Sequence, residues 1–136
     1  MTILIDTNVI LDVVGRDPAW TDWSRAQLNE AAMRDEIAIN EVVYAELSAG
    51  YRRFEDLDEF IARAGLVLVQ TPRPALFLSG KAFQRYRRRG GSRTGVLPDF
   101  FIGAHAVATD SPLITRDPRR YRTYFPGIDL ITPSVN

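Results

Sequence analysis

The feature that most constrains the fold is a regular alternation of very short, largely apolar runs with longer segments of helical pattern. The runs cover residues 2–5, 37–39, 66–69, 113–115 and 128–131. Runs this short, separated by helices, are typical of strands in a parallel sheet that is buried on both faces. We therefore predict an α/β fold with three α/β/α layers, in which helices flank a five-stranded parallel sheet.

The segments between these runs carry signals for helices. They are a short segment after Asp6 and residues 20–35, 41–49, 56–64, 75–89 and 99–109. The residues expected to begin the first four are polar: Thr7 or Asn8, Thr21 or Asp22, Asn40, and Asp56 paired with Glu59 as a capping box. Glycines are expected to end the third and fourth helices, at Gly50 and Gly65. Residues 90–95 form a glycine-rich loop.

Length and composition bound the class of protein. With 136 residues, 46% of them hydrophobic and 25% charged, the chain fits one compact domain over residues 1–136. It contains no cysteine, which excludes disulfides and thiolate metal sites. No apolar stretch approaches the roughly 20 residues that span a bilayer, and the first apolar run is too short for a signal peptide. We therefore expect a cytoplasmic protein without a membrane anchor.

The formal net charge of zero hides an uneven distribution. Residues 1–72 hold 13 acidic and 6 basic side chains, a net −7, whereas residues 73–136 hold 4 acidic and 11 basic side chains, a net +7. All the basic residues except Lys81 are arginine, whose planar fork suits phosphate. The split favours a surface that binds a polyanion. A genome biased toward arginine codons explains the arginine count equally well.

Three aspartates stand at the edges of apolar segments, where a plain solubilising charge is less expected. Asp6 directly follows the first predicted strand, and Asp117 comes shortly after the fourth. Because sites in open parallel sheets form at the carboxyl ends of the strands, these two side chains are expected to converge. Asp99 begins the helix that feeds the fourth strand, where the positive helix N-terminus tolerates a carboxylate.

A fourth carboxylate, Glu46, is selected by its place on a predicted helix. It lies three and four residues after Val43 and Val42 and therefore shares their apolar face. A carboxylate on an apolar face is costly unless it is paired or bound to a metal. The neighbouring Glu41 is more simply a charge in the first turn that complements the helix dipole.

Carboxylates that converge repel each other unless a cation neutralises them. Mg²⁺ or Mn²⁺ fits best, because both prefer oxygen ligands and can activate bound water against a phosphodiester. Thr7, Asn8 and Thr115 are then expected to orient the ligands or the substrate. On spacing alone the alternative stays open, because some of 17 acidic residues border strands by chance as helix caps or surface charges.

Four segments taken together resemble the PIN-domain ribonucleases, and in particular the VapC toxins of toxin–antitoxin pairs. They are residues 5–11 (IDTNVIL), 40–47 (NEVVYAEL), 97–106 (LPDFFIGAHA) and 113–121 (LITRDPRRY). The resemblance spans nearly the whole chain, over residues 3–133. The acidic positions of the family pattern match Asp6, Glu46, Asp99 and Asp117, and a small hydroxyl position matches Thr115.

This resemblance implies a PIN-like fold and an Mg²⁺- or Mn²⁺-dependent endoribonuclease that hydrolyses RNA phosphodiester bonds by metal-activated water. It assigns metal binding and catalysis to Asp6, Glu46, Asp99 and Asp117. The products are expected to carry a 5′-phosphate and a 3′-hydroxyl. The resemblance also implies a homodimer, and neutralisation by a cognate antitoxin protein that can push a basic residue into the acidic pocket.

Basic residues in the second half of the chain are the expected RNA contacts. They are Lys81, Arg85, Arg88, Arg89, Arg93 and Arg116. The first four fall close to one helical face, and such a stripe would neutralise backbone phosphates. Arg93 lies on the glycine-rich loop and can close over a substrate. The alternative is an exposed face that is simply solvated.

Other functions compete with a nuclease. A haloacid-dehalogenase-like phosphatase also begins with an aspartate after its first strand, but it needs Asp-x-Asp, and Asn8 stands at the third position. Such a phosphatase, like a receiver domain, also needs a late lysine, and Lys81 does not suit it. A non-catalytic PIN-like module that binds RNA or protein is the main alternative. His105 lies roughly 240° around its helix from Asp99 and is expected to pack rather than to act as a base.

Overall fold

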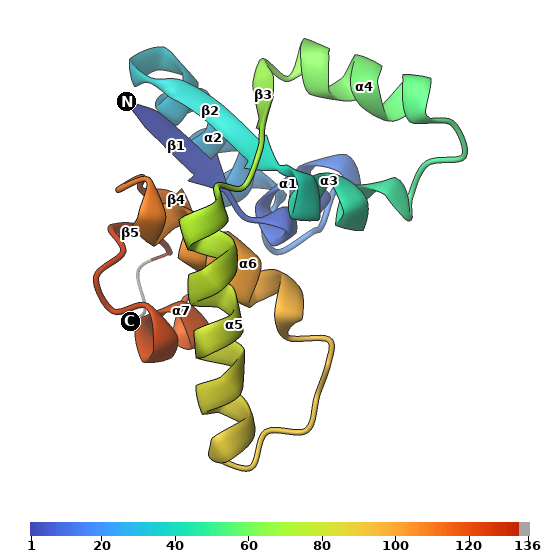
Figure 1. Cartoon of the computed structure of the whole chain (residues 1–136). Helices are drawn as coiled ribbons and strands as arrows, with labels where there is room; N and C mark the ends of the chain where they lie inside the picture. Colours follow the sequence, from blue (N-terminus) through green and yellow to red (C-terminus); the bar gives the residue numbers. More distant parts are fainter. Residues whose placement is uncertain (134–136) are drawn as a thin grey trace.

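A computed structural model describes residues 1–133 of the chain (Figure 1). Within these residues the strands are β1 (Thr2–Ile5), β2 (Glu36–Asn40), β3 (Leu66–Val69), β4 (Leu113–Ile114) and β5 (Leu130–Ile131). The helices are α1 (Thr7–Val14), α2 (Thr21–Arg34), α3 (Glu41–Ser48), α4 (Phe54–Arg63), α5 (Arg73–Arg88), α6 (Leu97–Ala108) and α7 (Arg119–Tyr124). All five predicted strands are present, the last two shorter than predicted.

The five strands form one parallel sheet in the order β3-β2-β1-β4-β5. Ile3 lies opposite Ile37 on one side of β1, and Ile5 lies opposite Ile114 on the other. The chain moves outward from β1 through β2 to β3, and then returns to place β4 on the opposite side of β1. This reversal makes the boundary between β1 and β4 a topological switch point, where such sheets form their sites. The predicted α/β fold with a five-stranded parallel sheet is confirmed.

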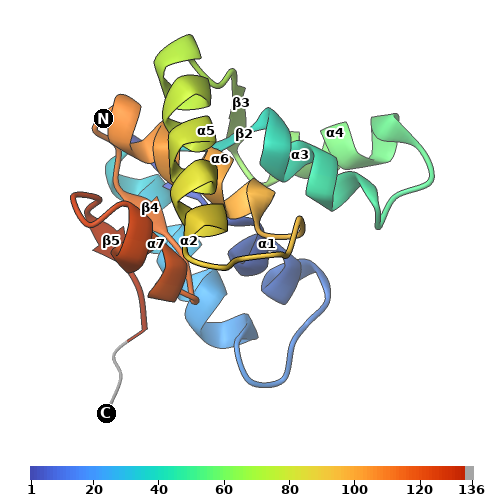
Figure 2. The same cartoon turned by 60° about the horizontal axis from the view of Figure 1, so that its bottom comes forward.

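Helices cover both faces of the sheet (Figures 1 and 2). On one face α5 packs against α6, with α7 beside α6, and on the other face α1 packs against α2. The α4 helix follows α3 and extends from the body of the molecule toward β3 (Figure 1). Within residues 1–133 no helix is long and apolar enough to cross a membrane.

The core lies along the central strands, because their side chains are apolar on both faces. Residues 3–5 of β1 and 37–39 of β2 are at most 3% exposed. Phe100 of α6 and Tyr121 of α7 are the largest fully buried side chains and close the core near the carboxyl ends of the strands. Burial of this apolar surface fixes the ends of β1 and β4, and so fixes the residues that follow them.

Helix ends follow the predictions in part. Asn40 caps α3 as predicted, by accepting hydrogen bonds from the first-turn N–H groups. Gly65, with φ of 71°, follows the end of α4 as predicted. In contrast, α1 is capped by Asp6, which accepts the N–H of Thr7, and not by the residues after it. The cap position of α2 is Trp20, which makes no side-chain cap, so both predicted caps of that helix are wrong.

Four helices differ clearly from the prediction in their start or their existence. One of them is α5, which begins at Arg73 and not at residue 75. α4 begins at Phe54, so Asp56 and Glu59 lie inside it, and the predicted capping box is wrong. α6 begins at Leu97, two residues before Asp99, because the proline between them is tolerated in the first turn of a helix. The short helix α7 was not predicted, since its arginine-rich sequence has no sustained apolar period.

Candidate active site

Asp6 is the most deeply buried of the four predicted acidic residues. It follows β1, caps α1 and is 4% exposed. Its Oδ1 accepts the N–H of Thr7 at 2.8 Å. Its Oδ2 accepts the hydroxyls of Thr115 at 2.7 Å and Tyr121 at 2.9 Å, and the Asn8 amide at 3.3 Å. The carboxylate is therefore held in one orientation by groups from α1, α7 and the segment after β4.

The pKa of Asp6 is shifted mainly by burial, with a smaller contribution from the charge of a neighbouring carboxylate. Its pKa is raised to about 6, chiefly because burial disfavours the charged form, and the charge of Asp99 adds to the effect. The hydrogen bonds from Thr115, Tyr121 and Thr7 oppose this rise, because they favour the ionised carboxylate. At neutral pH Asp6 is charged at a cost in free energy that a nearby cation would offset.

The charges of Asp99 and Asp117 interact, although the two residues come from different elements. Burial raises the pKa of Asp99 and the charge of Asp117 adds to it, while the Arg120 guanidinium opposes both. Nη1 of Arg120 donates a hydrogen bond to Oδ2 of Asp99, and each of these side chains is about one-third exposed. Asp99 therefore already has a cationic partner from α7.

Asp117 is exposed and is held by its backbone. Its N–H donates to Oγ1 of Thr115 at 3.1 Å, and the Thr115 hydroxyl in turn donates to Asp6. Asn8 reaches across from α1 to the same segment: its Nδ2 lies 3.4 Å from the Thr115 hydroxyl, and its Oδ1 accepts the N–H of Arg116 at 3.3 Å. Thr115 and Asn8 thus join the residues after β1 to those after β4.

Glu46 lies beside this group, but the reason for selecting it is wrong. Val43 is buried as expected, whereas Glu46 is exposed and does not share an apolar environment with it. Its position comes instead from Thr7, whose Oγ1 donates to Oε1 of Glu46 at 2.7 Å. Because the N–H of Thr7 donates to Asp6, one threonine contacts both carboxylates. Glu41, by contrast, accepts hydrogen bonds from the distant loop after β3.

The four carboxylates thus gather at the switch point of the sheet. Their oxygen-only donor set is the kind that Mg²⁺ and Mn²⁺ bind. Within residues 1–133, however, no three acidic or histidine side chains are close enough to hold one metal ion as they stand. The donor chemistry fits a hard divalent cation, and the placement of the side chains requires at least one of them to move.

Tyr121 is a site residue that the sequence analysis missed. Its hydroxyl donates to Asp6, and its pKa is raised well above the usual value by burial and by the charges of Asp6, Asp99 and Glu46. The hydroxyl is therefore a fixed donor and not an acid that ionises near neutral pH. The available signal was the four-residue spacing of Tyr121 and Phe125, which places both on one face of a short helix.

A partly buried ion pair joins the segment after β4 to α1. Nε of Arg116 donates to Oδ2 of Asp12 at 2.8 Å, and the Ser24 hydroxyl donates to the same oxygen at 2.8 Å. Asp12 is only 2% exposed, and the Arg116 guanidinium also lies 5.7 Å from the Trp20 ring centroid. The hydrogen bond to Asp12 raises the pKa of Arg116. Part of this predicted RNA-binding side chain is therefore engaged inside the protein.

The predicted basic stripe lies on the exposed side of α5. Lys81, Arg85, Arg88 and Arg89 are all exposed. Nη2 of Arg85 donates to the carbonyl of Tyr124 at 3.1 Å. The guanidinium groups of Arg85 and Arg89 lie 5.7 and 5.8 Å from the Tyr124 ring centroid. Two of the four basic residues thus contact α7, the helix that carries Tyr121 and Arg120.

A pocket of about 250 Å³ adjoins the acidic residues. Its lining comes from α5, from α7 and from Asp117, which lies two residues before α7. The lining residues are Tyr86, Asp117, Arg119, Arg120, Thr123 and Tyr124. Arg93 lies close by on the glycine-rich loop, where its N–H donates to the Tyr86 hydroxyl at 3.2 Å. The pocket therefore combines aromatic and cationic side chains directly beside Asp117 and Arg120.

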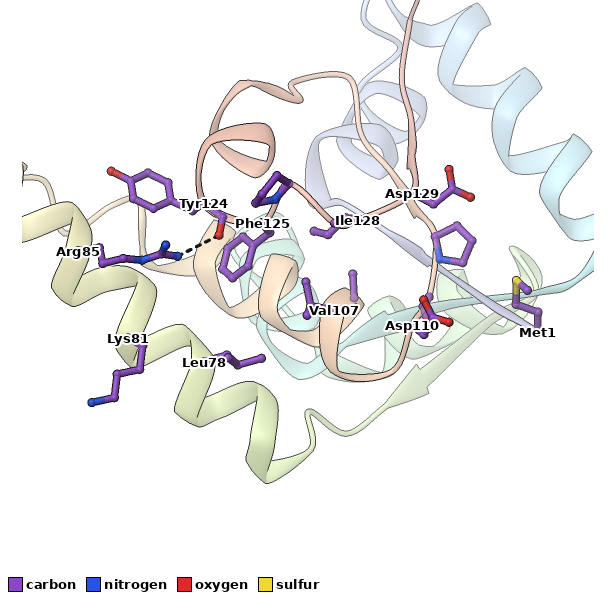
Figure 3. Close-up of a pocket in the computed structure, with 15 residues that line it drawn as sticks. Met1, Leu78, Lys81, Arg85, Val107, Asp110, Tyr124, Phe125, Ile128 and Asp129 are labelled. Atoms are coloured by element: carbon purple, nitrogen blue, oxygen red, sulfur yellow. Dashed lines mark hydrogen bonds between the residues drawn. The ribbon is translucent and has the colours of Figure 1, made fainter.

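The largest cavity, of about 540 Å³, lies elsewhere (Figure 3). It is bounded by α5, the end of α6 and the segment between α7 and β5, and none of the four predicted acidic residues lines it. Lys81 and Arg85 lie at its edge, and Lys81 points away from it (Figure 3).

His105 packs as predicted. It is 3% exposed, and its Nδ1 lies 3.2 Å from the Asn40 amide nitrogen. Burial lowers its pKa, so the ring is neutral at physiological pH. It contacts the residue that caps α3 and supports the helix that carries Glu46.

Comparison with known proteins places the chain in a family. The sequence matches the PIN domain over residues 3–126, so the chain belongs to the PIN-domain family. This confirms the resemblance to PIN-domain proteins drawn from the four motifs. Comparison with curated proteins finds no match.

Solved structures similar to this chain share its fold. They include VapBC2 from Rickettsia felis bound to a promoter DNA fragment, with 23% sequence identity and a TM-score of 0.73 over 97% of this chain and 98% of that one. DNA-bound VapBC from Salmonella typhimurium is 20% identical, with the same TM-score and coverage. VapBC-1 from nontypeable Haemophilus influenzae is 18% identical, with a TM-score of 0.72 and again 97% and 98% coverage.

Proposed function

We propose that this PIN-domain protein is a metal-dependent endoribonuclease and the toxin of a VapBC-type toxin–antitoxin pair. The observation that carries the proposal is the gathering of Asp6, Glu46, Asp99 and Asp117 at the switch point between β1 and β4. Asp99 interacts electrostatically with both Asp6 and Asp117 at this edge, where α/β sheets form their sites. The raised pKa of Asp6 supports a site that requires a cation.

In this proposal Asp6, Glu46, Asp99 and Asp117 hold Mg²⁺ or Mn²⁺, which would supply an activated water and neutralise charge on the scissile phosphate. Thr115 and Tyr121 fix the carboxylate of Asp6, and Thr7 links it to Glu46. Such fixed orientation is the usual role of groups that contact metal ligands without binding the metal.

RNA is the proposed substrate, because arginines surround the approach to the carboxylates. Arg85 and Arg89 contact α7, and Arg93 lies on the loop beside Tyr86. Lys81 and Arg88 would extend this surface along α5, and the exposed part of Arg116 would contribute on the other side. Contacts of this kind neutralise backbone phosphates, so RNA binding is expected to weaken steeply with salt.

A cognate antitoxin and a homodimer are further parts of the proposal. The similar solved proteins are VapBC toxin–antitoxin complexes, and the aligned regions span nearly the whole of both chains. The proposal places the protein in the cytoplasm, where RNA and a co-expressed antitoxin are both accessible. Coexpression of the chain with its genomic neighbour, followed by size-exclusion chromatography with light scattering, measures both associations.

A second candidate is a non-catalytic PIN-like module that binds RNA or protein. The ion pair between Arg120 and Asp99 favours it, because a cationic side chain can neutralise the acidic group without any metal. The deciding experiment is cleavage of a total-RNA pool with Mg²⁺, Mn²⁺ or EDTA, by the wild type and by Asp99→Asn. The matched control is Asp129→Asn, an exposed acid at the largest cavity.

The nuclease proposal expects discrete, metal-dependent fragments with the wild type and the Asp129 variant, and at least a hundredfold slower cleavage with the Asp99 variant. RNA binding without cleavage under every metal condition would instead support the non-catalytic module. Fragments that persist in EDTA with the wild type but are absent with the Asp99 variant would indicate a metal-independent mechanism, and would reject the proposal.

A further inference from the structure

Arg120 already supplies a positive charge to the acidic group through its ion pair with Asp99. It is the second residue of α7, and its Nη1 donates to Oδ2 of Asp99. The ion pair is about one-third exposed on both sides. The preceding residue, Arg119, carries the same charge and lines the same pocket, but makes no ion pair among the described residues. The two arginines therefore differ in their contact with Asp99 and not in their charge.

A guanidinium and a divalent cation cannot both use the same carboxylate oxygen. The N–H of Arg120 lies against Oδ2 of Asp99, and its positive charge would repel a cation placed there. Among the described residues, no three acidic or histidine side chains are arranged around one centre while this contact is made. Asp99 interacts electrostatically with both Asp6 and Asp117, so its partner influences the whole group.

Space for an alternative position of Arg120 exists beside the ion pair. The pocket of about 250 Å³ is lined by Arg120 itself, by the Thr123 hydroxyl side chain and by the rings of Tyr86 and Tyr124. A guanidinium can stack on such rings, as Arg85 and Arg89 already do on Tyr124. The side chain can therefore leave Asp99 without moving α7.

We propose that Arg120 is an internal competitor of the metal ion: it pairs with Asp99 in the metal-free protein and is displaced into the adjoining pocket when a divalent cation binds. This inference rests on the metal centre of the proposed function. Its consequence is that the chain carries its own counter-ion, which keeps the acidic group stable without metal and lowers the affinity for metal by a fixed factor.

The size of that factor follows from the exposure of the ion pair. A partly exposed pair changes an equilibrium constant by up to about fivefold, and removal of a positive charge from beside the cation adds to this. Arg120→Gln is therefore expected to tighten Mn²⁺ binding roughly 5- to 10-fold. Arg119→Gln removes the same charge one residue away and is expected to change it less than about twofold. Arg120→Lys keeps the charge and should bind Mn²⁺ about as weakly as the wild type.

Isothermal titration of the RNA-free, full-length protein with Mn²⁺ measures these affinities directly, with circular dichroism to verify folding of each variant. Tighter binding in the Arg120→Gln protein alone supports the proposal. Equal affinities in the Arg120→Gln and Arg119→Gln proteins, with Mn²⁺ binding lost in Asp99→Asn, overturn the role of Arg120 and leave the metal centre standing. No Mn²⁺ binding by the wild type or by Arg120→Gln overturns the metal centre and the inference together.

A second measurement needs no substitution at Arg120. In a spectrum of arginine side-chain ¹⁵Nε resonances, added Mg²⁺ is expected to shift the Arg120 signal and to leave the Arg119 signal nearly unchanged. An Arg120 resonance that stays fixed at saturating Mg²⁺ would show that the guanidinium does not move, and would overturn the proposed displacement.

Discussion

Replacing Asp6 with asparagine is expected to stabilise the metal-free protein near neutral pH, although the substitution would remove a proposed metal ligand. The pKa of this carboxylate rises from 3.8 to about 6, mainly through burial. When Asp6 is ionised, that rise costs the folded state about 3 kcal/mol. The asparagine side chain has one acceptor oxygen, so it cannot accept both the Thr7 N–H and the hydrogen bonds now made to Oδ2. The lost hydrogen bond costs about 1 kcal/mol. The variant should therefore be about 2 kcal/mol more stable near pH 7.5.

The sign of the pH dependence follows from which state loses its proton first. Well below the unfolded pKa of 3.8, Asp6 is protonated in both states, and its ionisation contributes nothing to stability. As the pH rises, the unfolded chain ionises first, so the cost to the folded state grows until Asp6 itself ionises near pH 6. The advantage of the variant should accordingly fall from about 2 kcal/mol near pH 7.5 to less than about 1 kcal/mol near pH 5.

Urea denaturation in EDTA, followed by circular dichroism at both pH values, measures the difference in stability between the variant and the wild type. Because the two proteins are compared at the same pH, the titration of all other groups cancels. The exposed-acid variant Asp129→Asn serves as the control and should differ from the wild type by the same small amount at both pH values. An Asp6→Asn protein that is less stable than the wild type near pH 7.5, or a difference that does not change with pH, would refute the argument from burial.

Three further substitutions test packing and the partly buried ion pair. Asp12→Ala leaves the partly exposed Arg116 without its partner. It should lower the free energy of unfolding, measured by urea denaturation, by about 2 kcal/mol, which is less than for a fully buried pair. No change would mean that the pair is not formed. Gly103→Ala places a Cβ 2.5 Å from the Phe125 ring and should lower the free energy of unfolding by about 1–3 kcal/mol. In Gly80→Ala the new Cβ meets nothing within 4 Å, so this substitution should raise the free energy of unfolding by about 0.5–1 kcal/mol. Equal effects would contradict the packing of α6 against Phe125.

The sequence predicts those parts of the site that depend on local position. Asp6 and Asp117 come shortly after apolar runs, and the carboxyl ends of parallel strands meet at one edge of the sheet. The alternation of strands and helices therefore suffices to place both residues at the same edge. Thr7, Asn8 and Thr115 follow from the same argument, and the structure places all three in contact with the carboxylates.

Glu46 illustrates the limit of reasoning from a helical face. Glu46 stands at the predicted spacing from Val43. However, α3 is only eight residues long and lies at the edge of the sheet, so the helix face that carries Glu46 is exposed. What brings this residue to the site is its hydrogen bond with Thr7, 39 residues earlier in the chain. Local periodicity does not reveal a hydrogen bond between residues so far apart in the sequence.

The contributions of α7 were missed for a related reason. Six residues are too few to show an apolar period, and three arginines conceal the helix among the basic residues. Tyr121 and Arg120 reach Asp6 and Asp99 only because α7 packs beside α6. Likewise, nothing in the sequence near Arg116 indicates a partner. In the structure it pairs with Asp12, which lies 104 residues earlier in the chain.

The chemical nature of the RNA ends tests the account most directly. Wild-type protein would cleave a defined RNA with Mn²⁺, and the fragments would be analysed by 5′-phosphate-dependent ligation and by mass spectrometry. Hydrolysis by metal-activated water at Asp6, Glu46, Asp99 and Asp117 predicts 5′-phosphate and 3′-hydroxyl ends that disappear with EDTA or with Asp99→Asn. Fragments that carry 2′,3′-cyclic phosphates and 5′-hydroxyls would mean that the RNA's own 2′-hydroxyl is the nucleophile, and would contradict the metal centre.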